Sequence, residues 1–312
     1  MLDFSNSKIL IVGDVMLDKY YFGKVDRISP EAPVPIVNIQ KEESRLGGAS
    51  NVANNIVSLG GHSLLCGVIG HDLFGKEIER ISRHKNIDTF LLKTSSPTIT
   101  KARIIGGKQQ IVRVDYEDKS ELNADNKKLF RDTISRILPE YDILVISDYG
   151  KGLISEDLCR YLIKLAHKYD KKVIIDPKGK NWEKYSGADI VTPNVKELSD
   201  IVGYTVPNTD RAIEKAAREA ITNNHLTALL VTRSDKGMSL IGPIPPIHIP
   251  THSEEVCDVS GAGDTVVATL GLCLAAGFEI SEAMRTANIA AGIVVKKVGT
   301  ATLTIEELVQ QK

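Results

Sequence analysis

The stretch Lys8–Asp14, KILIVGD, is a short apolar run rich in isoleucine and valine that ends in glycine and aspartate. A run of this length and content is typical of a strand buried on both faces of a parallel sheet. Similar runs that lead into polar residues recur at Ile143–Ile146, Lys172–Ile175, Asp189–Val191 and Ala228–Val231. Helical patterns lie between most of these runs, at Ala49–Leu59, Gly75–Lys85, Lys127–Leu138, Glu156–Tyr169 and Arg211–Asn223. The alternation predicts an α/β fold with a doubly wound, mostly parallel sheet flanked by helices.

A second pattern predicts a small β-sheet beside the large one. Thr98–Ile105 and Gln110–Tyr116 alternate apolar and polar residues around Gly106-Gly107, which is a hairpin signal. Lys19–Val25 and Pro33–Gln40 also read as extended, with prolines suited to sheet edges. We expect one domain over residues 1–312, with the small sheet formed by insertions at about 15–40 and 97–117. The C-terminal part predicts consecutive helices at Asp264–Ala276, Glu282–Lys296 and Ile305–Gln311.

Composition and charge exclude several classes of protein. Lys plus Arg (39) nearly balance Asp plus Glu (40), which argues against a nucleic-acid-coating surface. No apolar stretch approaches the ~20 residues that cross a bilayer, and the first residues, MLDFSNSKIL, lack the features of a secretory signal. The four cysteines are far apart and form no CxxC pair, which favours free thiols. We therefore expect a cytoplasmic protein with neither nucleic acid nor membrane as a partner.

Polar residues follow the predicted strands at their carboxyl ends. In open α/β sheets this edge is where ligands bind. Ordinary turn chemistry explains any single case, but the five strands together predict a polar, charged ligand. The residues concerned are Asp14, Asp148, Lys151, Asp176, Lys178, Asn194, Thr232 and Arg233.

The strongest local signal is Asp258–Thr265, DVSGAGDT, directly before an apolar helix. Gly261 and Gly263 allow a tight turn whose backbone N–H groups, with the helix N-terminus, can hold an anion. Phosphoryl transfer needs such a cradle, and Asp264 could accept the proton of an attacking hydroxyl. The alternative is a glycine-rich loop with Asp264 as a helix N-cap. No GK[ST] follows, so this is not a Walker A motif.

Two other loop-to-helix junctions are ambiguous by themselves. Leu46–Asn51, LGGASN, could bring backbone and Asn51 close to sugar hydroxyls, but by itself the stretch is better explained as a plain loop-to-helix junction. Asn194 and Glu197 have the spacing of a capping box, and they could also order Mg²⁺ and ATP phosphates. The seven histidines show no HxxxH or HExxH spacing, which gives zinc catalysis little support.

These motifs together resemble the ribokinase/phosphofructokinase-B family of sugar kinases. The resemblance spans nearly the whole chain: Gly13-Asp14 after the first strand, Gly47-Gly48 before Asn51, Asn194-x-x-Glu197 and Gly261-Ala-Gly-Asp264. The stretches GDVMLDKY, RISPEAPVPIV, GGASNVANNI, PTITKARI, SDYGKGL, IDPKG, LLVTRSDKGMSL and DVSGAGDTV are similar to the branch of the family that phosphorylates heptose 7-phosphate.

The resemblance implies a reaction and its cofactors. The γ-phosphate of ATP would pass to the anomeric hydroxyl of D-glycero-β-D-manno-heptose 7-phosphate, giving heptose 1,7-bisphosphate on the route to ADP-heptose and the lipopolysaccharide core. ATP and Mg²⁺ are the implied cofactors, with a monovalent cation as a further candidate. The family also implies a β-sheet lid that pairs subunits into a homodimer.

The resemblance also implies roles for single residues. Asp264 would be the base, with Gly261, Ala262 and Gly263 forming the anion hole. Asn194, Val195, Lys196 and Glu197 would lie at the ATP phosphates and Mg²⁺, with no direct protein ligand to the metal, and Thr232, Arg233, Gly237 and Asn288 would border the nucleotide. Asp14, Gly47, Gly48 and Asn51 would hold sugar hydroxyls. The candidates for the sugar phosphate are Lys178, first, and then Arg103, Lys101, Arg113 and Lys151.

Three other functions are compared with this prediction: one stays open and two are disfavoured. A kinase for another phosphorylated sugar, such as fructose or tagatose phosphate, shares the same machinery. A non-catalytic sugar-phosphate sensor is disfavoured because Asp264 and both glycines are present, and a dehydrogenase because no GxGxxG follows an early strand.

The sequence holds one kinase-length unit without an HxGH-type nucleotidyltransferase signature. We expect the adenylyl transfer either on another polypeptide or on a part of the chain outside this sequence.

Overall fold

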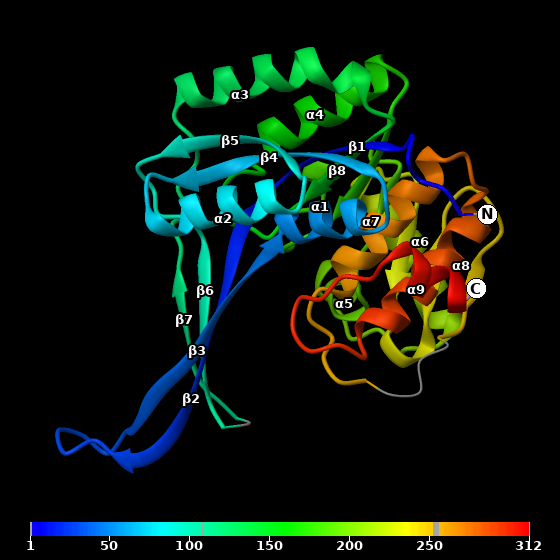
Figure 1. Cartoon of the computed structure of the whole chain (residues 1–312). Coiled ribbons are helices and arrows are strands. Elements are labelled where there is room, and N and C mark those ends of the chain that lie inside the picture. Colours follow the sequence, from blue (N-terminus) through cyan, green and yellow to red (C-terminus); the bar gives the residue numbers. More distant parts are fainter. Residues whose placement is uncertain (1, 108, 252–255, 312) are drawn as a thin grey trace.

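The computed structural model describes residues 2–107, 109–251 and 256–311 (Figure 1). Its large sheet has nine strands in the order β13-β12-β11-β10-β9-β8-β1-β4-β5. All neighbours from β5 to β11 are parallel, while β12 and β13 are antiparallel additions at one edge. The strand bounds are β1 Lys8–Gly13, β4 His62–Gly70, β5 Asp88–Thr94, β8 Ile143–Ser147, β9 Lys172–Asp176, β10 Ile190–Val191, β11 Leu229–Thr232, β12 Met238–Ile241 and β13 Ile247–Ile249.

Helices cover both faces of this sheet, and strand β1 shows why. Ile9 and Ile11 belong to one buried cluster with residues of α1, α2, α7, α8 and α9, whereas Leu10 and Val12 belong to a second cluster with α3, α4, α5 and α6. Alternate side chains of a strand point to opposite faces, so a continuous apolar run needs cover on both. The helix bounds are α1 Ala49–Ser58, α2 Leu73–His84, α3 Ala124–Ile137, α4 Glu156–Lys168, α5 Val195–Val202, α6 Asp210–Asn224, α7 Ala262–Ala275, α8 Ile280–Val294 and α9 Ile305–Gln311.

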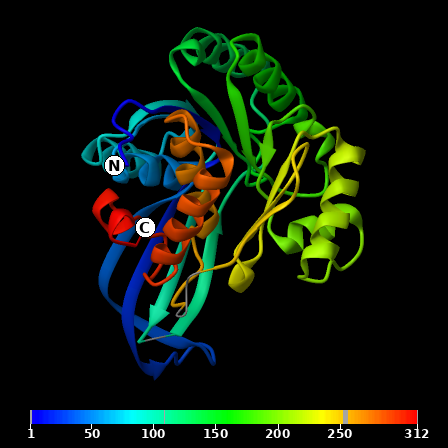
Figure 2. The same cartoon turned by 90° about the vertical axis from the view of Figure 1, so that its right-hand side faces the viewer.

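The structure confirms the predicted fold class and places the predicted strands and helices within a few residues, except for one strand of the small sheet that continues beyond its predicted end. The five apolar runs became β1, β8, β9, β10 and β11. Strands β4, β5, β12 and β13 are not among the predicted strands. Figure 2 shows the orange and red C-terminal helices packed beside the blue and cyan N-terminal part of the chain, which brings α7 against α1.

The small sheet has four strands in the order β3-β2-β6-β7 and extends away from the large sheet (Figure 1). The predicted hairpin is confirmed as β6 Thr100–Gly106 and β7 Gln109–Tyr116, which are antiparallel. Strands β2 (Val15–Ile28) and β3 (Pro35–Gly48) form a longer ribbon than expected, because β3 continues past residue 40 as far as Gly48. The small sheet therefore leads directly into the Gly47-Gly48 turn and helix α1.

No helix in the described ranges combines the length and the apolar character that a membrane span requires.

Candidate active site

Asp264 lies in the first turn of α7, and its side chain is buried. Gly261 precedes the helix with φ 82°, the left-handed conformation that glycine adopts without strain. One carboxylate oxygen of Asp264 accepts a hydrogen bond of 2.7 Å from Asn51 Nδ2, and the other accepts one of 2.7 Å from the Tyr149 hydroxyl. The turn thus presents a buried carboxylate beside the start of a helix. The Ala262 N–H donates to the Val259 carbonyl at 3.2 Å, and the Gly263 N–H that follows has no acceptor within the helix.

Burial raises the pKa of Asp264 to about 6. The hydrogen bonds from Asn51 and Tyr149 act in the opposite direction, as does the positive charge of Lys101, while the nearby Asp18 carboxylate raises the pKa further. A carboxylate with a pKa of about 6 is mostly ionised at neutral pH and is a stronger base than an exposed aspartate. The site therefore fits general-base chemistry.

Asp14 follows β1 and is also buried. Its carboxylate accepts hydrogen bonds from the backbone N–H groups of Tyr149 (2.9 Å), Lys151 (3.0 Å) and Leu153 (3.4 Å). Burial and then the charge of Asp148 raise the pKa of Asp14 to about 6, against the effect of these hydrogen bonds. Asp14 thus fixes the loop after β8 and keeps a polar group at the sheet edge.

The Gly47-Gly48 turn brings backbone into close contact with this edge. Gly48 has φ 55°, and a Cβ atom there would lie 2.6 Å from the Asp14 carbonyl oxygen. A Cβ at Gly47 would lie 2.6 Å from Asp18 Oδ2. The turn therefore requires glycine, and it sets Asn51 of α1 against Asp264.

Four of the five predicted phosphate-binding cations have a carboxylate partner. Arg103 of β6 bonds Asp18 of β2 at 2.6 Å. The others pair as Arg113 with Asp115, Lys151 with Glu117 and Lys178 with Glu197. The ammonium of Lys101 lies 5.7 Å from the centroid of the Tyr149 ring. Within the described part of the chain, the Lys101 side chain makes no hydrogen bond or ion pair. Burial lowers the pKa of Lys101; the charge of Asp18 is the next largest effect and opposes this, and the nearby cations lower the pKa further.

Lys178 follows β9 and pairs with a residue of α5. Its Nζ donates to Glu197 Oε1 at 2.9 Å. Glu197 and Asn194 form the capping box of α5, in which each side chain bonds the other's backbone N–H. The prediction that these two residues cap a helix is thus confirmed, and Lys178 joins them rather than Asp14 and Asp18.

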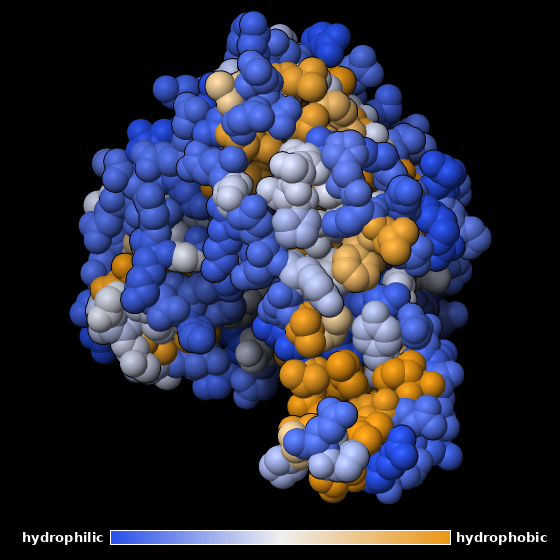
Figure 3. Space-filling view, turned by 90° about the vertical axis from the view of Figure 1, so that its left-hand side faces the viewer, coloured by the Kyte–Doolittle hydropathy of each residue, from blue (hydrophilic) through white to orange (hydrophobic). Residues whose placement is uncertain are grey.

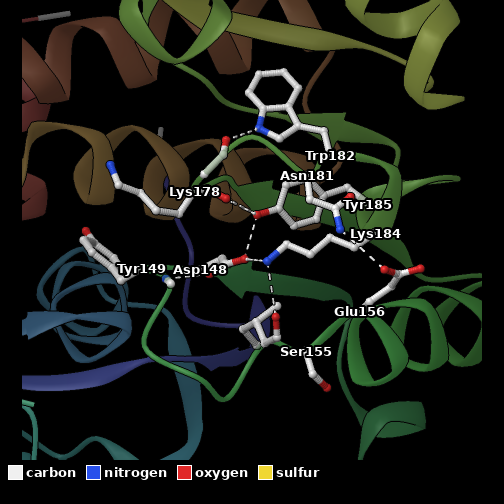
Figure 4. Close-up of polar contacts among 12 residues, drawn as sticks. Asp148, Tyr149, Ser155, Glu156, Lys178, Asn181, Trp182, Lys184 and Tyr185 are labelled. Atoms are coloured by element: carbon white, nitrogen blue, oxygen red, sulfur yellow. Dashed lines mark hydrogen bonds and ion pairs between the residues drawn. The ribbon is translucent and has the colours of Figure 1, made fainter. Parts of the chain in front are cut away.

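A buried ion pair anchors the loops that carry Tyr149 and Lys178 (Figure 4). Asp148 pairs with Lys184 and accepts a 2.6 Å hydrogen bond from the Tyr185 hydroxyl. The same hydroxyl accepts a hydrogen bond from the backbone N–H of Lys178 at 3.0 Å. This cluster joins the loop after β8 to the loop after β9, so the two loops hold one another in place.

A cavity of about 570 Å³ lies on the α5 and β11 side of Asp264. An isolated bridge between Asn194 and Thr232 joins its walls, and Asn288 of α8 donates to the Pro250 carbonyl at 2.7 Å. The predicted residues that line the cavity are Asn194, Thr232, Gly237, Ala262, Gly263 and Asn288. Several apolar side chains complete it, including Met238, Val259, Val266 and Val295. An apolar cavity that opens onto a helix N-terminus suits a nucleotide.

Four predicted nucleotide residues do not line this cavity in the described part of the chain: Val195, Lys196, Glu197 and Arg233. Arg233 is buried, and its guanidinium donates to Asp210 at 2.6 Å, Ser239 at 2.9 Å and Asn208 at 2.9 Å. Its donors are committed to holding β11, β12 and α6 together. The structure therefore assigns Arg233 to the scaffold of the cavity.

The sequence alone assigned no role to four residues that the structure brings into the site or beside it. Asp18 follows Asp14 by four residues in GDVMLDKY, which is the same-face spacing of a strand. Tyr149 comes directly after Asp148 at a strand end, so its position could have been noticed. Lys184 and Tyr185 carried no signal, because they reach Asp148 from 36 and 37 residues away in sequence.

The sequence pattern of the pfkB family carbohydrate kinases matches residues 6–307. The bifunctional protein HldE of Haemophilus influenzae (strain PittEE) is 46% identical over 308 residues, and HldE of Chromohalobacter salexigens is 46% identical over 304 residues. These matches cover 98% and 97% of the chain, which spans 63% of the length of either relative. Escherichia coli phosphofructokinase-2 in complex with potassium has a similar fold, with a TM-score of 0.79, 20% identity and 97% coverage of both chains. Arabidopsis thaliana ribokinase complexed with ribose and ATP gives a TM-score of 0.76, 19% identity and 98% coverage of both chains. The chain therefore belongs to the pfkB family and is a sugar kinase of the ribokinase fold.

Proposed function

We propose that this chain phosphorylates D-glycero-β-D-manno-heptose 7-phosphate at its anomeric hydroxyl, with ATP as the donor, in cytoplasmic synthesis of the lipopolysaccharide core precursor ADP-heptose. The observation that supports this most directly is the position of Asp264. It lies between the nucleotide-sized cavity and a face of the small sheet that carries Lys101 and Arg103. The choice of heptose rests on the sequence stretches that resemble heptose 7-phosphate kinases.

In the proposed reaction, the chain's own residues act as the base, the anion hole and the sugar-binding groups. Asp264 takes the proton of the anomeric hydroxyl as the sugar oxygen forms its bond to the γ-phosphorus and the bond to ADP breaks. The N–H groups of Ala262 and Gly263, at the positive end of α7, stabilise the charge on the transferring group. Asp14, Asn51 and the Gly47-Gly48 backbone hold the sugar hydroxyls. Because Asp264 is enclosed, the proton transfer is shielded from bulk water.

The nucleotide side has the chemistry for Mg²⁺-ATP. In the described ranges no group of three or more His, Cys, Asp or Glu could hold a metal by itself. The side-chain oxygen atoms of Glu197 and Asn194 lie at the N-terminus of α5. They suit a Mg²⁺ ion that is bound to the ATP phosphates, because Mg²⁺ prefers oxygen ligands and retains water. Mg²⁺ would neutralise charge on the phosphates. We propose that Lys178, which donates to Glu197 from the loop after β9, contacts the same phosphates.

The test is ADP release by the purified protein with ATP and Mg²⁺, with and without K⁺, on a panel of acceptors. The panel contains heptose 7-phosphate, fructose phosphates, tagatose phosphate, ribose and adenosine. Selective turnover of heptose 7-phosphate is the expected result. Preference for another sugar would refute the heptose assignment but keep the kinase reaction. If no acceptor is phosphorylated by protein that still binds ATP, the non-catalytic sugar-phosphate sensor would be favoured. Equal rates of ADP release with and without K⁺ would exclude a monovalent cation as a cofactor.

Two lysine substitutions separate the sugar phosphate from the nucleotide phosphates. We expect Lys101→Met to raise KM for the phosphorylated sugar by about 10- to 100-fold, because a charge-assisted contact is lost, and to change KM for the unphosphorylated heptose little. We expect Lys178→Met to raise KM for ATP instead, since Lys178 lies with Glu197. Steady-state kinetics of both variants on both substrates measure this. A selective effect of Lys178→Met on the phosphorylated sugar would restore Lys178 as its phosphate-binding residue.

The small sheet is proposed to act as a lid over the sugar and as the surface that forms a homodimer. Figure 3 shows apolar side chains gathered on this protruding sheet. The exposed apolar residues of its strands include Val25, Ile28, Ile39, Val112 and Val114. Exposed apolar residues that gather in one place in this way are typical of an interaction surface.

Charge on this patch is expected to break the dimer. Val112 and Val114 share one face of β7, so the double substitution Val112→Glu/Val114→Glu places two carboxylates in the proposed interface. We expect light scattering to give the mass of a dimer for the unmodified chain and of a monomer for this variant at micromolar concentration. Leu129→Glu is the matched control, because Leu129 is an exposed apolar residue of α3, outside the small sheet, and this variant should stay dimeric. A monomeric unmodified chain, or an unchanged dimer in the double variant, would refute the interface.

A further inference from the structure

We propose that Tyr149 is a positioning residue of the kinase reaction, whose hydroxyl orients the Asp264 carboxylate and stabilises its charge. The inference rests on the proposed function and deepens it. The Tyr149 hydroxyl donates to one oxygen of Asp264 at 2.7 Å, while Asn51 donates to the other at 2.7 Å. Two donors, one on each oxygen, fix the plane of a carboxylate that has to meet a sugar hydroxyl.

The backbone of Tyr149 is also held in place by hydrogen bonds. Its N–H donates to Asp14 at 2.9 Å, and its neighbour Asp148 is anchored by Tyr185 and Lys184 (Figure 4). The ammonium of Lys101 lies 5.7 Å from the centroid of its ring. Tyr149 thus connects the two buried aspartates of the site, Asp14 through its backbone and Asp264 through its side chain.

The hydroxyl bond leaves Asp264 free to act as the base. A carboxylate oxygen has two lone pairs, so the oxygen that accepts from Tyr149 can also accept from a sugar hydroxyl. Burial, followed by the charges of Asp264 and Asp176, raises the pKa of Tyr149 well above its usual range. Tyr149 therefore stays protonated, and the sugar proton passes to Asp264.

The charged and titratable groups around Asp264 set the direction of the expected effect. Asp18 on β2 raises its pKa and Lys101 on β6 lowers it. Asp176 at the end of β9 also lies near Asp264, and burial, followed by the charge of Asp264, raises the pKa of Asp176 well above its usual range. The hydrogen bonds from Asn51 and Tyr149 favour the ionised form. Removing the Tyr149 hydroxyl therefore raises the pKa of Asp264, and a base with a higher pKa becomes protonated, hence inactive, at a higher pH.

The test compares Tyr149→Phe with Tyr185→Phe by the pH dependence of kcat/KM for the preferred sugar. Loss of one hydrogen bond to a charged group corresponds to roughly one pH unit. We expect the acid limb of Tyr149→Phe to move up by about one unit, with rates approaching the unmodified enzyme above pH 8. Tyr185→Phe also deprives a buried carboxylate, Asp148, of a 2.6 Å hydroxyl bond, but Asp148 keeps Lys184 and the Gly150 N–H. Its acid limb should not move.

An unmoved limb in Tyr149→Phe, or an equal shift in both variants, would overturn the proposal. A second measurement needs no turnover: ¹³C NMR titration of aspartate-labelled, unliganded protein, with the Asp264 resonance identified by its loss in Asp264→Asn. We expect this resonance to titrate at higher pH in Tyr149→Phe, and an identical titration would refute the role of Tyr149. If no sugar is phosphorylated, the proposed function fails, while the titration still decides the contact between Tyr149 and Asp264.

Discussion

Asp264→Asn is expected to lower kcat by about 10²–10⁴-fold, the usual contribution of a general base. The amide has nearly the shape of the carboxylate but cannot take the proton of the sugar hydroxyl. The start of α7 and the cavity beside it, which are proposed to hold the nucleotide and the transferring phosphate, remain in place. We therefore expect the dissociation constant for ATP to change by less than about threefold, because that interaction does not require the base.

Stability measurements separate this loss from unfolding. The pKa of Asp264 is raised from 3.8 to about 6 in the folded state, mainly by burial. Its contribution to stability is thus complete below the unfolded pKa and is lost as pH rises through about 6, so the ionised group destabilises the fold at pH 7.5. The neutral amide removes that cost. We expect the Tm of Asp264→Asn at pH 7.5 to equal or exceed that of the unmodified chain.

The experiment combines single-turnover ADP release, calorimetric ATP binding and thermal unfolding on one preparation. Asp258→Asn is a matched control, because Asp258 belongs to the same motif but accepts its hydrogen bonds from the backbone N–H groups of Ser260 and Gly299. It should lose far less activity than Asp264→Asn. Turnover within threefold of the unmodified enzyme in folded Asp264→Asn would exclude Asp264 as the base.

The sequence was most informative where burial leaves a local signature. A strand covered on both faces must be apolar throughout, which is why β1, β8, β9 and β11 were recognisable. Strand β5 is the far edge of the sheet and is half-exposed with polar ends, and β12 and β13 have only four and three residues. The last part of β3 was missed because Lys41–Arg45 is charged, although a two-stranded ribbon needs no buried face to pair its backbone.

The candidate site was predictable in its positions but not in its pairings. Residues at strand ends share one edge because parallel strands do, so Asp14, Asp148 and Asn194 could be placed from the sequence. The contact between Tyr149 and Asp264 joins residues 115 apart, and Lys178 reaches Glu197 through a loop whose course the local pattern does not define. Which cation meets which carboxylate depends on the packing of β6, β7 and the loops, and only the folded structure shows that Lys178 belongs with Glu197.

Lys184→Met is expected to lower the free energy of unfolding by about 3–5 kcal/mol, the usual effect of removing one partner from a buried ion pair. The side chain of Asp148 is 1% exposed and that of Lys184 is 13% exposed. Methionine fills a similar volume but leaves the buried Asp148 carboxylate without its counter-ion. The Tyr185 hydroxyl and the Gly150 N–H still donate to Asp148, which keeps the loss at the lower end of this range.

A double substitution shows whether the loss comes from the stranded charge. Asp148→Asn/Lys184→Met removes both charges, and the amide oxygen still accepts from Gly150. We expect urea unfolding to show that the double variant recovers at least half of the stability lost in Lys184→Met. As a surface control, Lys93→Met breaks the exposed pair with Glu79 and should cost less than about 1 kcal/mol.

The same variants connect this ion pair to the site. Lys184 also donates to the Ile154 carbonyl, so it ties the loop of Tyr149 to that of Lys178 (Figure 4). If the pair holds both loops, Lys184→Met should raise KM for ATP and for the sugar together, because Lys178 and Tyr149 both shift. The double variant should restore both constants in parallel with its stability. A Lys184→Met protein as stable as the unmodified chain would mean that the Asp148 carboxylate finds another partner, and that the pair is not what fixes these loops.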